Sequence, residues 1–224
     1  MNATHIAAIA SGGVHFLAYL AYAIALLRGR IEGNPLTWLM FAYGTSLMAF
    51  LEYRAAAPWT ELVLPTTCAI SSVIIAIMTV KPGAWRGLGP IDFIAFATDV
   101  VLTIAYVGTW LATHSGYLRA DAMTAWLGVF LIAANASTAV QFIPILRSTW
   151  AAPENEQVAP WLLWTSAYAI LLGVTLIETP DNVALIVYPL TGVTLHSLMA
   201  LCIIIGRWRL SMMRARDRQM SKKR

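Results

Sequence analysis

The sequence predicts an all-α membrane protein in which seven transmembrane helices form two parallel three-helix repeats joined by a linker helix. Three observations carry this prediction. Hydrophobic residues make up 59% of the chain and charged residues only 12%, which leaves too little polar surface to cover a soluble protein of this size. The apolar residues gather in seven long segments, and the segments before the central one resemble those after it.

The seven apolar segments take up almost the whole chain. They span residues 5–27, 35–51, 62–80, 91–112, 122–146, 160–177 and 182–206. Each is near the roughly 20 residues that a helix needs to cross a hydrocarbon core about 30 Å thick. Helices are favoured over barrel strands because the apolar runs are continuous rather than alternating at every second residue. The first segment is long enough to span and follows no basic residue, so we expect a retained helix rather than a cleaved signal peptide.

The distribution of Lys and Arg predicts the orientation of the chain. With the N-terminus outside, only Arg54 and Arg119 lie on the outer side, and the other 13 of the 15 basic residues lie inside. The positive-inside rule therefore predicts an outer N-terminus and an inner C-terminus. The overall composition fits an integral protein of the bacterial inner (plasma) membrane. The inner set is Arg28, Arg30, Lys81, Arg86, Arg147, Arg207, Arg209, Arg214, Arg216, Arg218, Lys222, Lys223 and Arg224.

The two halves of the chain repeat a series of local features. Residues 26–28 and 145–147 both end an apolar segment in Arg, and Pro35 and Pro160 both begin the next segment, with Trp just inside. Proline is tolerated in a first helical turn because its missing N–H has no helical partner there. Pro65 and Pro189 recur near the start of the third segments, each with a Thr two residues later. One segment separates the triplets, so the repeats are parallel, which is one plan of secondary transporters.

These features divide the chain into four parts. Residues 1–80 form the first three-helix repeat, and residues 81–121 form the linker helix with its loops. Residues 122–206 form the second three-helix repeat, and residues 207–224 form a basic cytoplasmic tail. The connecting loops are short, so no soluble domain fits between the helices. The tail is expected to bind anionic lipid headgroups, if it has a partner at all, and no nucleic acid.

One stretch of the second repeat resembles a known superfamily. Residues 141–147 (QFIPILR), followed by Trp161, Trp164 and Tyr168, are similar to the helix, basic turn and aromatic helix of a PQ-loop repeat. The arrangement of three, one and three helices resembles the SWEET sugar transporters and the wider PQ-loop group, which includes nicotinamide riboside carriers of the Pnu type. Two positions depart from the pattern: Ile145 stands where the family has Gln, and Ala25 marks a first repeat without the proline. The resemblance implies a solute site between the repeats and a hinge at Pro144.

Six side chains are candidates for binding the solute near the membrane midplane. Intramembrane polar groups usually face a cavity or a partner, so large ones suggest function. The same residue types also hold helices together, which leaves both readings open for Asn135 and His196 and favours a packing role for Ser72. His15 is expected to be a packing residue, because its sequence neighbours show no polar face. The candidates are Asn135, His196, Tyr43, Tyr168, Ser72 and Trp164.

Three carboxyl groups are candidates for gating or coupling, beside Pro144. Asp99 lies about two turns inside the fourth segment, where it must be protonated, hydrogen-bonded or facing water. We expect it to clamp the linker helix to a repeat through His196 or a Tyr hydroxyl, with proton coupling as the alternative. Glu52 and Glu178 end the second and sixth segments, where they either pair as an outer gate or stay solvated at the membrane rim.

The sequence thus favours a membrane transporter for a small polar or amphipathic solute (a sugar, a nucleoside or vitamin, or an amino acid). We expect it to work by alternating access and not to be an enzyme. A non-transporting sensor or assembly subunit on the same scaffold is the alternative. A retinal protein is excluded because no Lys lies within a segment, and a metal enzyme is disfavoured because the four His are dispersed. No cofactor is expected, and the oligomeric state is open.

Overall fold

The computed structural model describes residues 2–80 and 90–221, and its long helices confirm the all-α prediction. They are α1 (Ala3–Leu27), α2 (Pro35–Arg54), α3 (Trp59–Thr79), α4 (Pro90–His114), α5 (Ala120–Ala151), α6 (Val158–Glu178) and α7 (Val183–Ser221), with a 3₁₀ turn at Pro153–Asn155. The described residues contain no strand. Lys81, Arg86 and residues 222–224, which entered the prediction of orientation, lie outside the described ranges.

Six of these helices are long and apolar enough to cross a membrane, and α2 is the exception among those described. Several large apolar side chains on α1, α3 and α4, such as Ile6, Ile77 and Ile104, are more than half exposed. In lipid such side chains are solvated, whereas in water they form an aggregation-prone surface. α2 is less apolar because it packs against α3, α4 and α5 and so presents less of its surface to lipid. The fold is that of an all-α membrane protein.

The helix starts follow from local sequence. Asn2 and Asn34 cap α1 and α2, because each side-chain oxygen accepts a hydrogen bond from the backbone N–H three residues later. Two prolines have matching positions in their helices. Pro65 and Pro189 were expected near the starts of the third segments, and α3 and α7 begin six residues before them, at Trp59 and Val183. Both prolines therefore lie inside a helix, at the same distance from its start.

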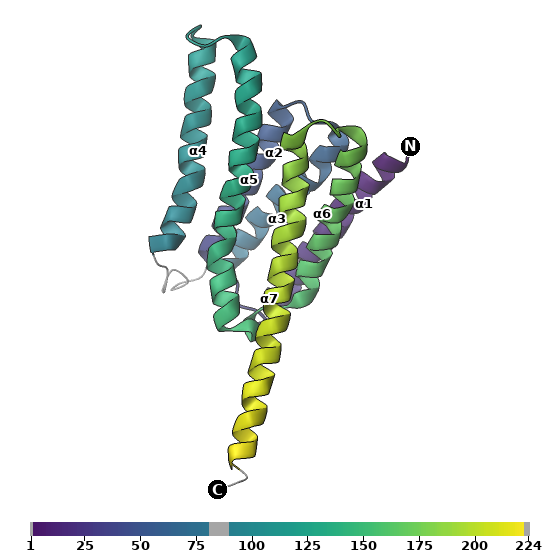
Figure 1. Cartoon of the computed structure of the whole chain (residues 1–224), viewed down its shortest axis with the longest axis vertical. Coiled ribbons are helices and arrows are strands. Elements are labelled where there is room, and N and C mark those ends of the chain that lie inside the picture. The colour runs from purple at the N-terminus through teal and green to yellow at the C-terminus, as the bar shows by residue number, and fades with distance from the viewer. Residues whose placement is uncertain (1, 81–89, 222–224) are drawn as a thin grey trace.

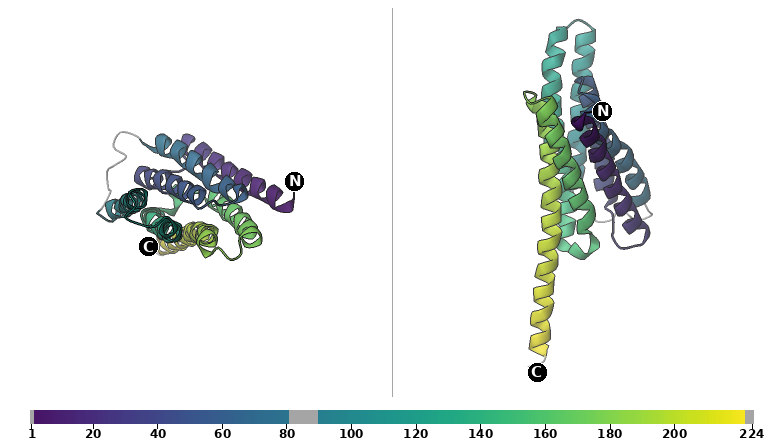
Figure 2. Two further views of the ribbon diagram at one scale, coloured as in Figure 1. Left: turned by 90° about the horizontal axis from the view of Figure 1, so that it is seen from above. Right: turned by 90° about the vertical axis from the view of Figure 1, so that its right-hand side faces the viewer.

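The helices pack in a reciprocal pattern (Figure 1). α3 packs against both α1 and α2, and α7 packs against both α5 and α6. Across the two sets, α1 packs against α6 and α2 packs against α5. α4 lies against α5 and, less extensively, against α2. Viewed from above, α1, α2 and α3 lie together and face α5, α6 and α7 (Figure 2, left). We call α1–α3 the first helix group and α5–α7 the second.

The two ends of the bundle are defined by their loops, and we name them after the predicted orientation. The inner end carries residues 28–34 and 152–157, and the outer end carries residues 55–58, 115–119 and 179–182. The last helix is much longer than the predicted segment 182–206, because the basic tail continues α7 without a break to Ser221. Figure 1 shows this extension leaving the bundle at the inner end.

Candidate functional site

A central aromatic cluster fills the contact between the two helix groups. Its members are His15, Tyr19 and Tyr22 of α1, Trp38 of α2, Trp161, Trp164 and Tyr168 of α6, and His196 of α7. Trp164 is 1% exposed and lies at the middle, with its ring centroid 5.0 Å from that of Tyr19 and 4.9 Å from that of Trp161. The rings meet mostly edge to face or tilted, as aromatic pairs prefer. Both helix groups therefore contribute to one buried set of rings.

The two histidines flank the ring of Tyr168. His196 stacks on Tyr168 at 5.0 Å between centroids, and His15 meets the same ring edge-on at 5.3 Å. Nδ1 of His196 lies 2.7 Å from the backbone oxygen of Gly192. The sequence placed His196, Trp164 and Tyr168 among the candidates for one site, and these three do lie together.

His15 is fully buried, yet neither of its ring nitrogens has a hydrogen-bond partner among the described residues. The indole N–H of Trp164 is also buried without a partner in residues 2–80 and 90–221. An unmet buried polar group costs about 1–3 kcal/mol, so such groups are uncommon in native structures. His15 was expected to be a packing residue, but its unmet nitrogens in the contact between groups make it a candidate site residue. A spacing of four, four and three along α1 links Ser11, His15, Tyr19 and Tyr22, and this helical stripe was the available sequence signal.

The ring of Tyr168 is fixed in place by its neighbours. A Cβ atom on Gly192 would lie 2.3 Å from the Tyr168 ring, so only glycine allows α7 to approach this closely. The Tyr168 hydroxyl lies 3.1 Å from the Tyr188 hydroxyl and 3.8 Å from Sγ of Cys68. Tyr168 is thereby held by α3, α6 and α7 together.

Ser72 has a supporting position. Its hydroxyl lies 2.6 Å from that of Tyr19, and the side chain is fully buried between α1 and α3. Ser72 thus orients Tyr19, which in turn contacts Trp164 and His15. This contact joins two helices of the same group, in line with the packing role expected for Ser72.

Two predicted site residues lie away from the cluster. The Tyr43 hydroxyl donates to Thr103 of α4 at 2.7 Å. Nδ2 of Asn135 donates to the backbone oxygen of Leu131 and lies 4.0 Å from the sulfur of Met48. Tyr43 therefore faces α4, and Asn135 faces α2.

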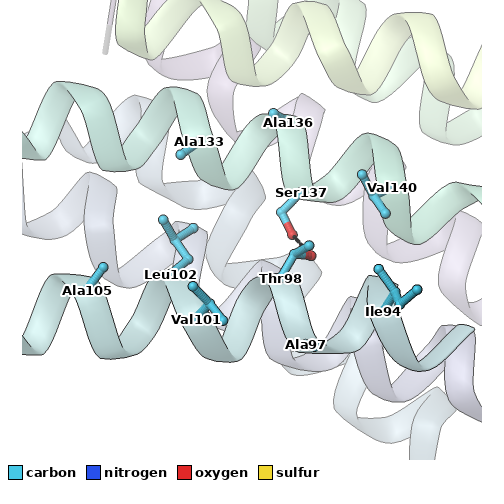
Figure 3. A pocket seen from close by; sticks show the side chains of 10 residues that line it. All are labelled: Ile94, Ala97, Thr98, Val101, Leu102, Ala105, Ala133, Ala136, Ser137 and Val140. Carbon is cyan, nitrogen blue, oxygen red and sulfur yellow. Dashed lines mark hydrogen bonds between the residues drawn. The ribbon is translucent and has the colours of Figure 1, made fainter. Parts of the chain in front are cut away.

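Asp99 joins α4 to α5. Its carboxylate accepts hydrogen bonds from the Ser137 hydroxyl at 2.5 Å and from the Gln141 amide at 2.7 Å. The predicted partners, His196 or a Tyr hydroxyl, are therefore wrong. The packing of α4 against α5 brings two polar side chains of α5 to Asp99 instead. Thr98 extends the network through its hydroxyl, which lies 2.8 Å from that of Ser137 (Figure 3).

The inner end carries a contact that sequence reasoning missed, which we call the inner latch. The carboxylate of Glu156 accepts hydrogen bonds from the Tyr22 hydroxyl at 3.0 Å and from the Trp161 indole at 3.3 Å. The Arg207 guanidinium donates to the backbone oxygens of Glu156 and Pro153. Burial raises the pKa of Glu156 to about 7, although its hydrogen bonds oppose the rise. The latch links α1 of the first group to the loop before α6 of the second group. The sequence of this loop is polar, as in ordinary exposed loops, so it gave no sign of the contact.

A second contact at the inner end joins the two loops directly. The backbone N–H of Glu32 donates to the backbone oxygen of Asn155, and the Asn155 side chain donates to the Glu32 carboxylate at 3.2 Å. The loop after α1 therefore touches the loop after α5.

The outer end is also bridged, though not as predicted. Glu178 accepts a hydrogen bond from the Thr60 hydroxyl, and Glu61 accepts one from the Thr179 hydroxyl at 2.6 Å. Glu52 is 2% exposed, so a solvated position at the rim is wrong for it. In the part of the chain that the structure describes, Glu178 bonds to Thr60 rather than to Glu52. Glu61, for which no role was predicted, makes the second bridging contact at this end instead of Glu52. Pro144 is buried inside α5, where the sequence placed it.

Comparison of the chain with protein-family models, with curated proteins and with solved structures finds no match in any of the three.

Proposed function

We propose that this protein is a membrane carrier that moves a small polar or amphipathic solute by alternating access between its two helix groups. The observation that supports it most is the central aromatic cluster, which lies between the groups and receives side chains from both. Carriers built from parallel repeats hold their solute in this position, near the midplane between the repeats.

The packing pattern supports two equivalent repeats. The third helix of each group contacts both of the other helices, and α1 and α2 exchange contacts with α6 and α5. Pro65 and Pro189 lie six residues into the third helices, at matching positions. An arrangement in which each group repeats the other allows the groups to rock about the cluster without refolding.

The contacts at the two ends suit gates. Opening the inner end requires the bonds of Glu156 to Tyr22 and of Asn155 to Glu32 to break. Opening the outer end requires the bonds of Thr60 to Glu178 and of Thr179 to Glu61 to break. These contacts join one group to the other and consist of individual hydrogen bonds, two of them between Glu32 and Asn155. Each hydrogen bond contributes only about 0.5–3 kcal/mol. These hydrogen bonds therefore add only a modest cost in free energy to opening either end.

Spin-label distances test this proposal without knowledge of the solute. Labels at exposed Arg30 and Glu154 report the inner end, and labels at exposed Arg54 and Asp181 report the outer end, after replacement of Cys68 and Cys202 by Ser. A carrier in liposomes shows two populations at each pair. Removing the inner latch with Glu156→Ala increases the long-distance population inside and decreases it outside.

The matched control is Glu154→Ala, measured with the inner label moved to Ala151, because Glu154 is exposed in the same loop. It is expected to leave both distributions unchanged. One fixed distance at each end in every variant would contradict the carrier and favour the non-transporting sensor or assembly subunit.

A further inference from the structure

We propose that the central aromatic cluster binds an uncharged, planar solute whose amide-like edge forms hydrogen bonds with His15 and Trp164. The inference rests on the proposed carrier function and specifies the solute class for the same site. It follows from the hydrogen bonds that the cluster lacks, the shape of its rings and the charges around it.

The unmet groups define the edge of the solute. A neutral imidazole offers one donor and one acceptor, and an indole offers one donor. His15 and Trp164 together therefore need a partner that has both an acceptor oxygen or nitrogen and an N–H or O–H donor. A carboxamide or a lactam edge supplies both within one plane. Both residues are at most 1% exposed, so bulk water does not reach their unmet groups in this conformation, in which both ends of the bundle are bridged.

The rings define the shape of the solute. Between ring centroids, His15 lies 5.3 Å from Tyr168 and 6.5 Å from Trp164. The ring centroid of His196 lies 5.7 Å from that of Trp164. These rings already pack edge to face or stacked. A flat ring of the solute can therefore replace one of their ring neighbours at a similar spacing. Separation of the helix groups at one end admits such a solute between α1 and α6.

The surroundings define the charge of the solute. In the described part of the chain, the ring and hydrogen-bond contacts of the two histidines involve aromatic side chains and one backbone oxygen, and no carboxylate or cationic side chain. Glu156 lies at the inner edge of the cluster, where both of its carboxylate oxygens already accept hydrogen bonds. A charged solute loses its hydration here without gaining a counter-charge, which disfavours amino acids and other ions.

Three matched probes test the solute class on the detergent-purified full chain. Benzamide is flat and neutral and has an amide edge, benzoate is its charged counterpart, and cyclohexanecarboxamide is its non-planar counterpart. A ligand that binds only the native state raises the melting temperature as its concentration increases. Benzamide is expected to raise it, and the other two probes are expected to have at least about tenfold weaker effects. Equal effects of benzamide and benzoate, or none from benzamide, overturn the proposal.

Variants of His15 separate binding from packing. His15→Phe keeps a ring but removes the unmet nitrogens, so the ligand-free protein is expected to melt at the same or a higher temperature while its response to benzamide is lost. His15→Gln restores a donor and an acceptor and is expected to recover part of the response, which keeps the test valid if His15→Phe does not fold. His114→Phe is the control, since His114 is exposed and stacks on Trp110 of α4. Retained benzamide binding in His15→Phe overturns the proposal.

The two proposals fail in different ways. If the spin-label distances alternate but benzamide does not bind, the carrier stands and the solute class is wrong. If benzamide binds through His15 but the distances stay fixed, the site stands and the carrier is wrong.

Discussion

Two of the contacts that bury polar side chains among apolar ones differ in whether those side chains have partners. Between α4 and α5, Asp99, Ser137, Gln141 and Thr98 bond to one another. Between α1 and α6, His15 and Trp164 have unmet groups. The first contact is complete in this conformation and suits a fixed joint. The second lacks partners, and a solute can provide them.

The two regions also differ in how much empty volume they leave between their side chains. A groove of about 560 Å³ runs between α4 and α5, and its lining is almost wholly apolar and rich in alanine (Figure 3). Its polar groups bond within the protein and its apolar walls are suited to lipid. The central aromatic cluster is filled with rings instead. Available volume is therefore a poorer guide to the proposed solute site than unmet hydrogen bonds.

The largest expected effect comes from breaking the complete contact. Asp99→Leu leaves the Ser137 hydroxyl and the Gln141 amide without their acceptor, and should lower the free energy of unfolding by about 3 kcal/mol. Thermal unfolding in detergent measures it. Asp99→Asn, which retains one acceptor, should lose less. A loss as small as that of a surface variant would show that the network is not a joint.

The inner latch gives an effect of similar size that depends on pH. Glu156 has a folded-state pKa of about 7 against an ordinary value of 4.5, so the folded protein keeps a proton that the unfolded chain releases. Stability is therefore highest at or below pH 4.5 and falls as pH rises towards 7, by on the order of 3 kcal/mol, because a pKa difference of one corresponds to about 1.4 kcal/mol. Glu156→Gln should flatten this part of the melting profile. An unchanged slope in the variant would assign the pH dependence to other groups.

A pair of glycines compares the packing of the two regions. Gly192→Ala places a methyl group against the Tyr168 ring and should cost about 1–3 kcal/mol through overpacking. Gly108→Ala on α4 meets nothing within 4 Å, so stability should stay the same or rise slightly. Melting temperatures of the two variants give the comparison directly. Equal effects would mean that Tyr168 is not held as closely as described.

The smallest effect is expected in the groove. Ala133→Leu adds apolar volume where α4 and α5 leave room, and should change the free energy of unfolding by less than about 0.5 kcal/mol. Unfolding in detergent and in lipid nanodiscs can be compared. A large loss in lipid alone would indicate that the groove holds an ordered lipid chain.

Most of the helical architecture could be predicted from sequence, because hydrophobic segments of membrane length have few alternatives in lipid. The site was harder to predict. His15 seemed to be a packing residue because its sequence neighbours are apolar, but its spatial neighbours Trp164 and Tyr168 lie about 150 residues away on α6. Glu156 belongs to a loop in which exposed charges are ordinary, and only the fold brings Tyr22 to it. Asp99 was identified as a clamp, but its partners could not be chosen without the packing of α5.

The continuous α7 helix makes the C-terminus a lever. At 1.5 Å per residue, the 15 residues from Arg207 to Ser221 reach about 22 Å past the bundle. The arm leaves the inner end in line with the rest of the helix (Figure 1), and Arg207 ties its base to the inner latch. If the second helix group tilts, the tip of the arm is therefore displaced further than its base. The cluster of positive charge near Arg214 moves with the tip. If the helix groups move as proposed, a fluorophore on this arm would report that movement.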